Sequence, residues 1–134
     1  MIYKSFELSK IKLKNHKFYL FYGENEGLKD ETIKKLFEKN YQDKIQRYEE
    51  KEILDNIESF FNGVLTKSFF DNEKLIIINR ATDRIRTTID DLMEKNPEDI
   101  QIILNSKNLE KKSTLRKLFE KEKSIVCVPF YEDN

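Results

Sequence analysis

Five short apolar segments recur along the chain, and each has the length of a β-strand. They lie at residues 17–23, 43–48, 73–79, 99–105 and 124–130. Residues 75–78 and 100–104 are apolar almost throughout, which is typical of central strands buried on both faces of a parallel sheet. Residues 43–48 form the weakest candidate, because charged and polar side chains interrupt the pattern.

Between these segments, apolar residues recur every three or four positions, which predicts amphipathic helices. The helices are expected at residues 28–40, 52–65, 84–96 and 113–123. Ser113 can cap the last helix, and the Asn96-Pro97 pair predicts the end of the one before it. The segment before Phe18 fits a strand or a helix, and both interpretations stay open.

Strands and helices therefore alternate along the whole chain. This order predicts an α/β fold of three layers, in which a parallel five-stranded sheet carries helices on both faces. The length of 134 residues suits a single domain, 1–134, and we find no linker, repeat or low-complexity tract inside it.

The charges balance, with 25 Lys and Arg residues against 25 Asp and Glu residues. A net charge of zero gives no overall field that attracts nucleic acid or an anionic membrane, although a local basic patch remains open. One cysteine, Cys127, excludes an internal disulfide. No apolar run approaches the roughly 20 residues that span a bilayer, and the first residues lack a signal-peptide core. We expect a cytoplasmic protein.

The loop after the first strand contains Gly23, Glu24, Asn25, Glu26 and Gly27, and it invites comparison with a phosphate-binding loop. That loop requires the pattern G-x-x-x-x-G-K-[ST]. Here the two glycines are too close together, and no lysine directly follows the second. Asp30 also stands where a hydroxyl group for magnesium is needed, and the two glutamates repel phosphate. We expect a strand-to-helix turn that needs its glycines for backbone reasons, without nucleotide hydrolysis.

Few other residues indicate a metal, catalytic or binding site. With one histidine, His16, and one cysteine, we expect no structural zinc site, no other metal and no cofactor. His16 is expected on the surface, and Cys127 as a buried, inert thiol. The carboxylates have lysine neighbours and indicate no acid–base pair. Arg80, Arg84 and Arg86 form either a basic patch or the solvated start of a helix.

Phe69 and Phe70 stand side by side before the strand at residues 73–79, in a connection where polar residues are usual. Burying one phenylalanine stabilises a fold by roughly 1.5–3 kcal/mol, so both rings could close the end of the sheet. Alternatively, one or both rings are presented to the apolar pocket of a partner, since aromatic anchors dominate many interfaces.

Three segments, in the right order, resemble the delta subunit of bacterial DNA polymerase III, a clamp-loader subunit. They are "FYLFYGENEGLKDETIKKL" (18–36), "SFFDNEKLIIINR" (68–80) and "IQIILNSKNLEKKSTLRKLFEKEKSIVCVPFYED" (100–133). The resemblance extends over nearly the whole chain. It implies an AAA+-like fold that has lost its nucleotide site, which agrees with the separate interpretation of the first loop.

The resemblance also implies partners. Ser68, Phe69 and Phe70 match the family's segment that contacts the sliding clamp (the beta subunit), with Phe69 replacing a frequent aliphatic residue. The family opens the clamp for loading on primed DNA and leaves ATP hydrolysis to other clamp-loader subunits. Members of the family are subunits of a nucleotidyltransferase holoenzyme, and the subunit itself has no catalytic site. A basic cluster matches a surface that faces the DNA backbone: Lys107, Lys111, Lys112, Arg116 and Lys117.

Family members are longer, with a helical lid and a collar domain that are absent here. The resemblance therefore makes this chain an amino-terminal domain of a longer chain. Two other functions stay open. One is a small nucleotide-binding NTPase or transferase on the same fold, and the other is a nucleic-acid-binding module that uses the basic cluster.

Overall fold

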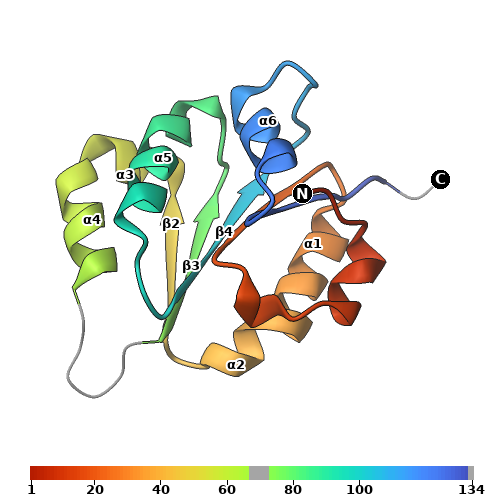
Figure 1. The fold of residues 1–134 in the computed structure, drawn as a ribbon, viewed down its shortest axis with the longest axis horizontal. Helices are drawn as coiled ribbons and strands as arrows, with labels where there is room; N and C mark the ends of the chain where they lie inside the picture. The colour runs from red at the N-terminus through yellow and green to blue at the C-terminus, as the bar shows by residue number, and fades with distance from the viewer. Residues whose placement is uncertain (67–72, 133–134) are drawn as a thin grey trace.

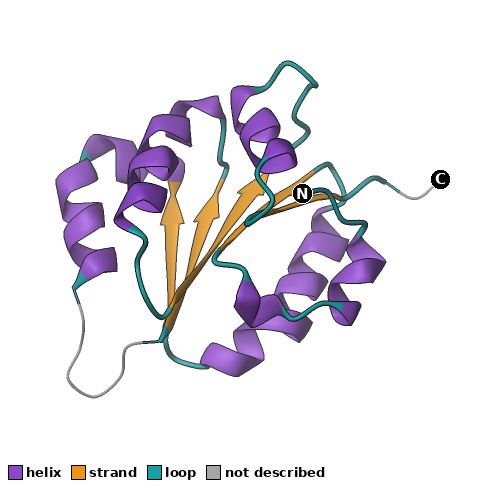
Figure 2. Cartoon of the chain, viewed as in Figure 1, coloured by secondary structure: helices purple, strands orange, loops and turns teal. Residues whose placement is uncertain are grey.

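The structure is a computed structural model that describes residues 1–66 and 73–132 (Figure 1). Its centre is a sheet of five parallel strands in the order β2-β3-β4-β1-β5 (Figure 2). The strands are β1 (Phe18–Tyr22), β2 (Ile45–Glu49), β3 (Lys74–Asn79), β4 (Ile100–Ser106) and β5 (Val126–Pro129). All five predicted strands are confirmed, and β2, the weakest candidate, is the half-buried strand at one edge.

Helices connect the strands, as the alternating pattern predicts. They are α1 (Glu26–Ile33), α2 (Lys39–Tyr41), α3 (Glu50–Asp55), α4 (Ile57–Leu65), α5 (Arg86–Lys95) and α6 (Thr114–Lys121). A π-helical turn, η3 (Lys34–Glu38), joins α1 to α2. Within the described residues, three 3-10 turns complete the elements: η1 (Ser5–Lys10), η2 (Leu13–Asn15) and η4 (Asp83–Ile85).

Two apolar cores lie on the two faces of the sheet, which confirms the three-layer arrangement. One core joins the sheet to α4, α5 and α6, through residues such as Phe60, Ile89 and Phe119. The other joins it to the α1–α2 segment and to η1, through Phe37 and Leu8 among others. Figure 1 shows the two helical layers on either side of the strands.

The connections leave β1 and β4 toward opposite faces. These two strands are neighbours in the sheet, yet α1 follows β1 on one face and α6 follows β4 on the other. In open parallel sheets, ligands bind beyond the carboxyl ends of the strands at such a point. The loop of Gly23 to Gly27 therefore occupies the place where a ligand is expected.

The helix predicted at residues 28–40 is observed as α1, η3 and α2, and the structure also defines two further segments. The helix predicted at residues 52–65 is two helices, because Asn56 leaves the helical conformation, with a φ of −154° and a ψ of 74°. Its side chain accepts a hydrogen bond from the Ser59 amide and so caps the second helix. The segment before Phe18 forms 3-10 turns. Ahead of them, Ile2 pairs with Cys127 and covers the free edge of β5.

Candidate functional site

Gly23 follows β1 with a backbone conformation that disfavours other residues. Its φ is +124°, and a Cβ at this position would lie 2.1 Å from the carbonyl oxygen of Phe130. The close approach of the chain after β5 therefore requires a glycine. This is a backbone reason for Gly23, as expected from the sequence.

Two amide groups of this loop donate to carbonyl groups of distant segments. The Gly23 amide donates to the Lys107 carbonyl at 3.1 Å, and the Asn25 amide donates to the Phe130 carbonyl at 3.3 Å. The Asn25 side chain caps α1 by accepting from the Leu28 amide at 3.1 Å. Phosphate-binding loops point such amides at the ligand. Here these donors are already satisfied.

Lys29 makes a contact that was not foreseen from the sequence. Its side chain is fully buried, and its ammonium group donates to Glu26 Oε1 at 2.9 Å and to the Ser106 carbonyl at 2.7 Å. This cation beside the loop thus links α1 to the end of β4. The spacing of Glu26 and Lys29 is the only sequence signal for the pair, and it is a common one on helices.

A hollow of about 290 Å³ lies at this edge of the sheet. Three carboxylates, from Glu26, Asp30 and Glu49, line it together with two basic residues, Arg80 and Lys107. Arg80 has a φ of +56°, and its Nε lies 3.1 Å from Glu49 Oε1. The surplus of negative charge disfavours a polyphosphate.

The other two arginines of the candidate basic patch have surroundings that differ from those of Arg80. Arg86 donates to the Thr114 carbonyl at 2.9 Å and lies 3.4 Å from Asp90. Arg84 is exposed within η4. Arg84 therefore fits the interpretation as a solvated helix start, whereas Arg86 is half-buried and bound within the fold.

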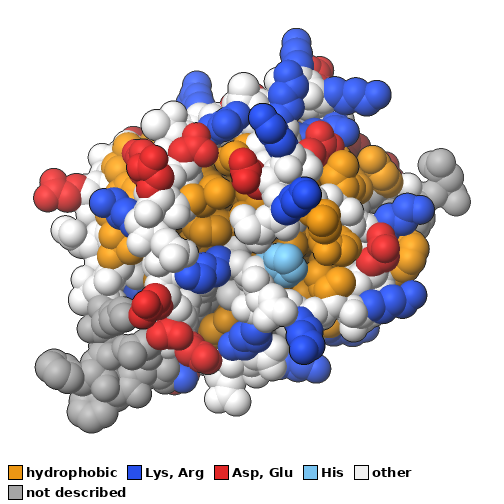
Figure 3. Space-filling model, viewed as in Figure 1, with side chains coloured by type: hydrophobic (Ala, Val, Ile, Leu, Met, Phe, Trp, Pro, Cys, Tyr) orange, Lys and Arg blue, Asp and Glu red, His pale blue; other side chains and the backbone are white. Residues whose placement is uncertain are grey.

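The basic cluster before and on α6 separates into two groups. Lys107, Lys111, Lys112 and Lys117 are exposed, and Figure 3 shows basic side chains gathered at the upper edge of the molecule, over α6 and the loop before it. Arg116 instead packs inward. Its contacts are Glu120 at 3.0 Å, the Leu109 carbonyl at 2.8 Å, and the Tyr22 ring, whose centroid is 5.0 Å away.

Asp83 fixes the start of α6 from the neighbouring connection. Its Oδ1 accepts hydrogen bonds from Ser113 Oγ at 2.5 Å and from the Leu115 amide at 3.1 Å. Desolvation opposes ionisation of this carboxyl group, but the hydrogen bonds from Ser113, Leu115 and Thr114 outweigh it and lower the pKa of Asp83. These hydrogen bonds fix the end of the lysine-rich loop that precedes α6.

Ser68, Phe69 and Phe70 lie outside the described residues. The residues that flank residues 67–72 are described, at the end of α4 and the start of β3. Thr66 donates to the Asn62 carbonyl through its amide, at 3.1 Å, and Lys74 Nζ donates to the Gly63 carbonyl at 2.7 Å.

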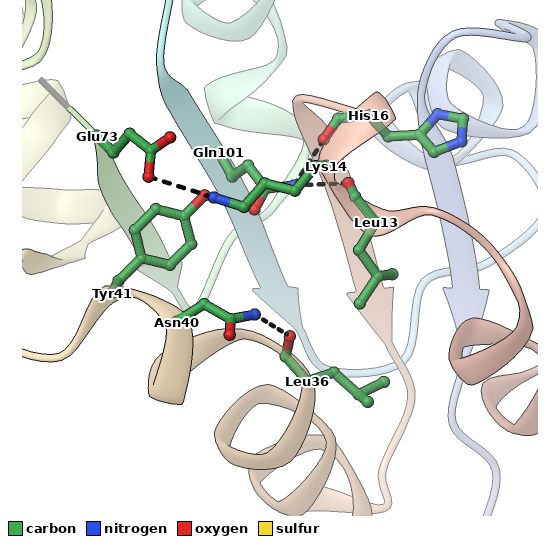
Figure 4. A network of polar contacts seen from close by, with 8 residues as sticks. All are labelled: Leu13, Lys14, His16, Leu36, Asn40, Tyr41, Glu73 and Gln101. Atoms are coloured by element: carbon green, nitrogen blue, oxygen red, sulfur yellow. Dashed lines mark hydrogen bonds and ion pairs between the residues drawn. The ribbon is translucent and has the colours of Figure 1, made fainter.

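A polar network holds the residue before β3 (Figure 4). Lys14 Nζ lies 3.4 Å from both Glu73 Oε2 and the Tyr41 hydroxyl group, and that hydroxyl group donates to Gln101 Oε1 at 2.6 Å. The buried Gln101 donates in turn to the carbonyl groups of Leu13 and His16, at 2.7 and 2.9 Å. The network joins η2, α2 and β4 to the start of β3.

The remaining candidate residues, His16 and Cys127, lie in surroundings that indicate a structural role. His16 is half-buried, with Nδ1 3.1 Å from the Ser124 carbonyl oxygen. Cys127 is buried, and desolvation raises the pKa of its thiol to about 12, which makes it unreactive. Within residues 1–66 and 73–132, no group of three or more His, Cys, Asp or Glu side chains could hold a metal ion. No helix in this part of the chain is long and apolar enough to cross a membrane.

Comparison with known proteins identifies a similar solved structure and a matching protein family. No curated protein sequence matches the chain. Among solved structures, the Bacillus subtilis DNA clamp loader delta protein (YqeN) is similar, with a TM-score of 0.66 and 16% sequence identity. The match covers 96% of this chain and 41% of that one, so this chain spans less than half of the related protein's length. The model of the family described as DNA polymerase III, delta subunit, matches residues 19–128. With most of its length matched in this way, the chain belongs to the family of DNA polymerase III delta subunits.

Proposed function

We propose that this chain binds a sliding clamp through Ser68, Phe69 and Phe70 and, within a clamp loader, helps to open it for loading on primed DNA. The observation that carries the proposal is the family match over residues 19–128, which includes these three residues. In this proposal the full-length protein carries a helical lid and a collar domain, through which it assembles with the other clamp-loader subunits.

The proposed mechanism is a wedge. The two phenyl rings bury in an apolar pocket of the clamp, where adjacent aromatic anchors supply most of the binding free energy. The bound surface then holds the neighbouring interface of the ring in a distorted shape. A ring closed by modest interfaces relaxes open at that seam.

This role needs no ATP hydrolysis by the chain itself. The bound amides of Gly23 and Asn25, the internal contacts of Lys29 and the acidic hollow support that assignment. The nucleotide state of partner subunits would expose or hide the clamp-binding surface. The exposed lysines near α6 provide a second, weaker role in contact with the DNA backbone.

The test is a calorimetric titration of this chain with the sliding clamp encoded in the same genome. Replacing Phe69 and Phe70 by Ala abolishes binding while the domain stays folded. A matched control replaces Phe6 and Tyr131, whose exposed fractions are 64% and 67%, by Ala. The control removes two exposed rings elsewhere and leaves clamp affinity unchanged. Retained affinity in the Phe69→Ala, Phe70→Ala variant overturns the proposal.

The alternative is a small NTPase or transferase on the same fold. Thermal unfolding with and without ATP and magnesium separates the two functions. A bound nucleotide at a hundred times its Kd would raise the free energy of unfolding by about 2.7 kcal/mol. We expect no shift of the unfolding midpoint.

A further inference from the structure

The α-amino group of Met1 lies at the carboxyl end of α6 (Figure 1). As an ammonium group it donates to three carbonyl oxygens: those of Phe119 at 2.7 Å, Glu122 at 2.7 Å and Ile125 at 2.9 Å. Phe119 lies in the last turn of α6, Glu122 is the residue that ends this helix, and Ile125 directly precedes β5. One amino group therefore joins the end of α6 to the start of β5.

The backbone around this amino group is fixed in the sheet. The Cys127 amide donates to the Met1 carbonyl at 2.9 Å, and the Tyr3 amide donates to the Cys127 carbonyl at 2.9 Å. Ile2 pairs with Cys127 in the parallel direction. The first residues thus extend the sheet beyond β5, and this pairing holds the amino group at the end of α6.

The carbonyl groups at this helix end need an outside donor. The last four carbonyl groups of a helix have no partner within the helix, and they carry the negative end of its dipole. In α6, the Leu118 carbonyl accepts from the Glu122 amide at 3.2 Å, and the Phe119 carbonyl accepts from Met1. Desolvation lowers the pKa of the amino group, although nearby acidic groups oppose the change. The group is thus partly buried, where a carbonyl group that loses its donor is costly.

We propose that the α-amino group of Met1 is a modification site that sets the stability of the domain: as a free amine it caps α6, and an acyl group on it, such as formyl, breaks the cap. An acylated nitrogen keeps one N–H and no charge, so two of the three carbonyl groups lose their donor. A formyl group on Met1 would have to be hydrolysed before the cap can form. In that hydrolysis water adds to the formyl carbon, the C–N bond breaks, formate leaves and the freed amine takes up a proton. This inference is independent of clamp binding.

The experiment compares the thermal unfolding of four forms of this chain. They are the free amine, the N-formyl form made with deformylation inhibited, a form extended before Met1 by a peptide that a protease can remove completely, and Lys121→Gln with a free amine. Mass spectrometry confirms the state of Met1 in each form. We expect formylation and extension to lower the unfolding midpoint by about 5–10 °C, because each removes donors from partly buried carbonyl groups.

Lys121 is the matched control, since it is an exposed cation in the last turn of the same helix. Its substitution by Gln removes one positive charge from this helix end but leaves the three hydrogen bonds of Met1. The midpoint should therefore change by no more than about 3 °C. A change as large as that caused by formylation would overturn the proposal, because the loss of charge alone would then suffice.

The two modified forms separate lost hydrogen bonds from steric crowding. Similar changes with formyl and with the longer extension support the cap, because both leave a single N–H on the Met1 nitrogen. A change with the extension alone indicates crowding and overturns the proposal, as does an unchanged midpoint in both forms. If the extended form does not fold, removal of the extension by the protease should restore the folded state. A cleaved chain that stays unfolded overturns the proposal.

Discussion

The ammonium group of Lys29 lies 2.7 Å from the carbonyl oxygen of Ser106, at the edge of the sheet where related folds bind ligands. A buried cation of the protein itself thus joins α1 to β4. The contact indicates that the strand-to-helix loop with its two glycines has a structural role, because Lys29 fixes the helix after the loop to the end of β4. Its importance can be measured through the stability of the domain.

Replacing Lys29 by Met should lower the free energy of unfolding by about 1–3 kcal/mol, because the Ser106 carbonyl is left without its buried donor. Urea unfolding measures the change. The matched control is Lys35→Met, since Lys35 is 70% exposed and pairs with Glu31 in the same helical segment. Its effect should stay within about 0.5 kcal/mol. Equal effects of the two substitutions would contradict the structural role of Lys29.

The two glycines of the same loop should respond in opposite ways to Ala. At Gly23, a φ of +124° and a distance of 2.1 Å between the added Cβ and the Phe130 carbonyl oxygen predict a destabilisation of about 3 kcal/mol or more. At Gly27, within α1, the nearest heavy atom is 4.0 Å from the added Cβ. Gly27→Ala should therefore raise the free energy of unfolding by about 0.5–1 kcal/mol. Thermal or urea unfolding of both variants tests the pair.

The stability contributed by Asp83 should depend on pH. The pKa of Asp83 in the folded protein lies below its usual value of 3.8, so its ionised form is favoured by folding. This contribution is present at neutral pH and disappears as the pH falls below about 4 and through the folded pKa. Asp83→Asn should be less stable than wild type at pH 7, and the difference should shrink toward about pH 3. Unfolding midpoints across this pH range measure it, and a constant difference would contradict the assignment.

The exposed lysines should determine any affinity for DNA. Replacing them together by Gln should weaken binding to a primed duplex and reduce the salt dependence, by about 0.9 in the log–log slope for each phosphate that is no longer neutralised. The four residues are Lys107, Lys111, Lys112 and Lys117. A control with the same change of charge replaces lysines of other exposed faces: Lys34, Lys35, Lys39 and Lys51. An equal decrease in affinity in both variants would mean that binding follows net charge and not this surface.

Arg116 should behave differently from those lysines. Because its guanidinium group contacts Glu120, Leu109 and Tyr22, Arg116→Gln should lower the free energy of unfolding by about 1–3 kcal/mol. DNA affinity of the folded variant should change less than in the lysine variant. A large decrease in DNA affinity at full stability would assign Arg116 to the DNA surface instead.

The sequence by itself determined the order of the elements and the class of the fold. Apolar runs such as residues 75–78 and helical spacing such as that of Leu115 and Phe119 are local patterns, set by whether a side chain is buried on one face or on two. Local sequence also argued against a phosphate-binding loop at Gly23, because the two glycines are too close together and no lysine directly follows the second. The assignment of Phe69 and Phe70 to the clamp came from the resemblance and stays a prediction, since they lie outside the described residues.

Tertiary structure alone decided which polar groups meet. Lys29 and Ser106 are 77 positions apart, and Asp83 and Ser113 are 30 positions apart, so no local pattern relates them. The separation of Arg116 from its neighbouring lysines likewise depends on Tyr22, a residue of a different element. Burial and hydrogen bonding of charged groups depend on the strand order β2-β3-β4-β1-β5, and the periodicity of single segments carries no information about that order.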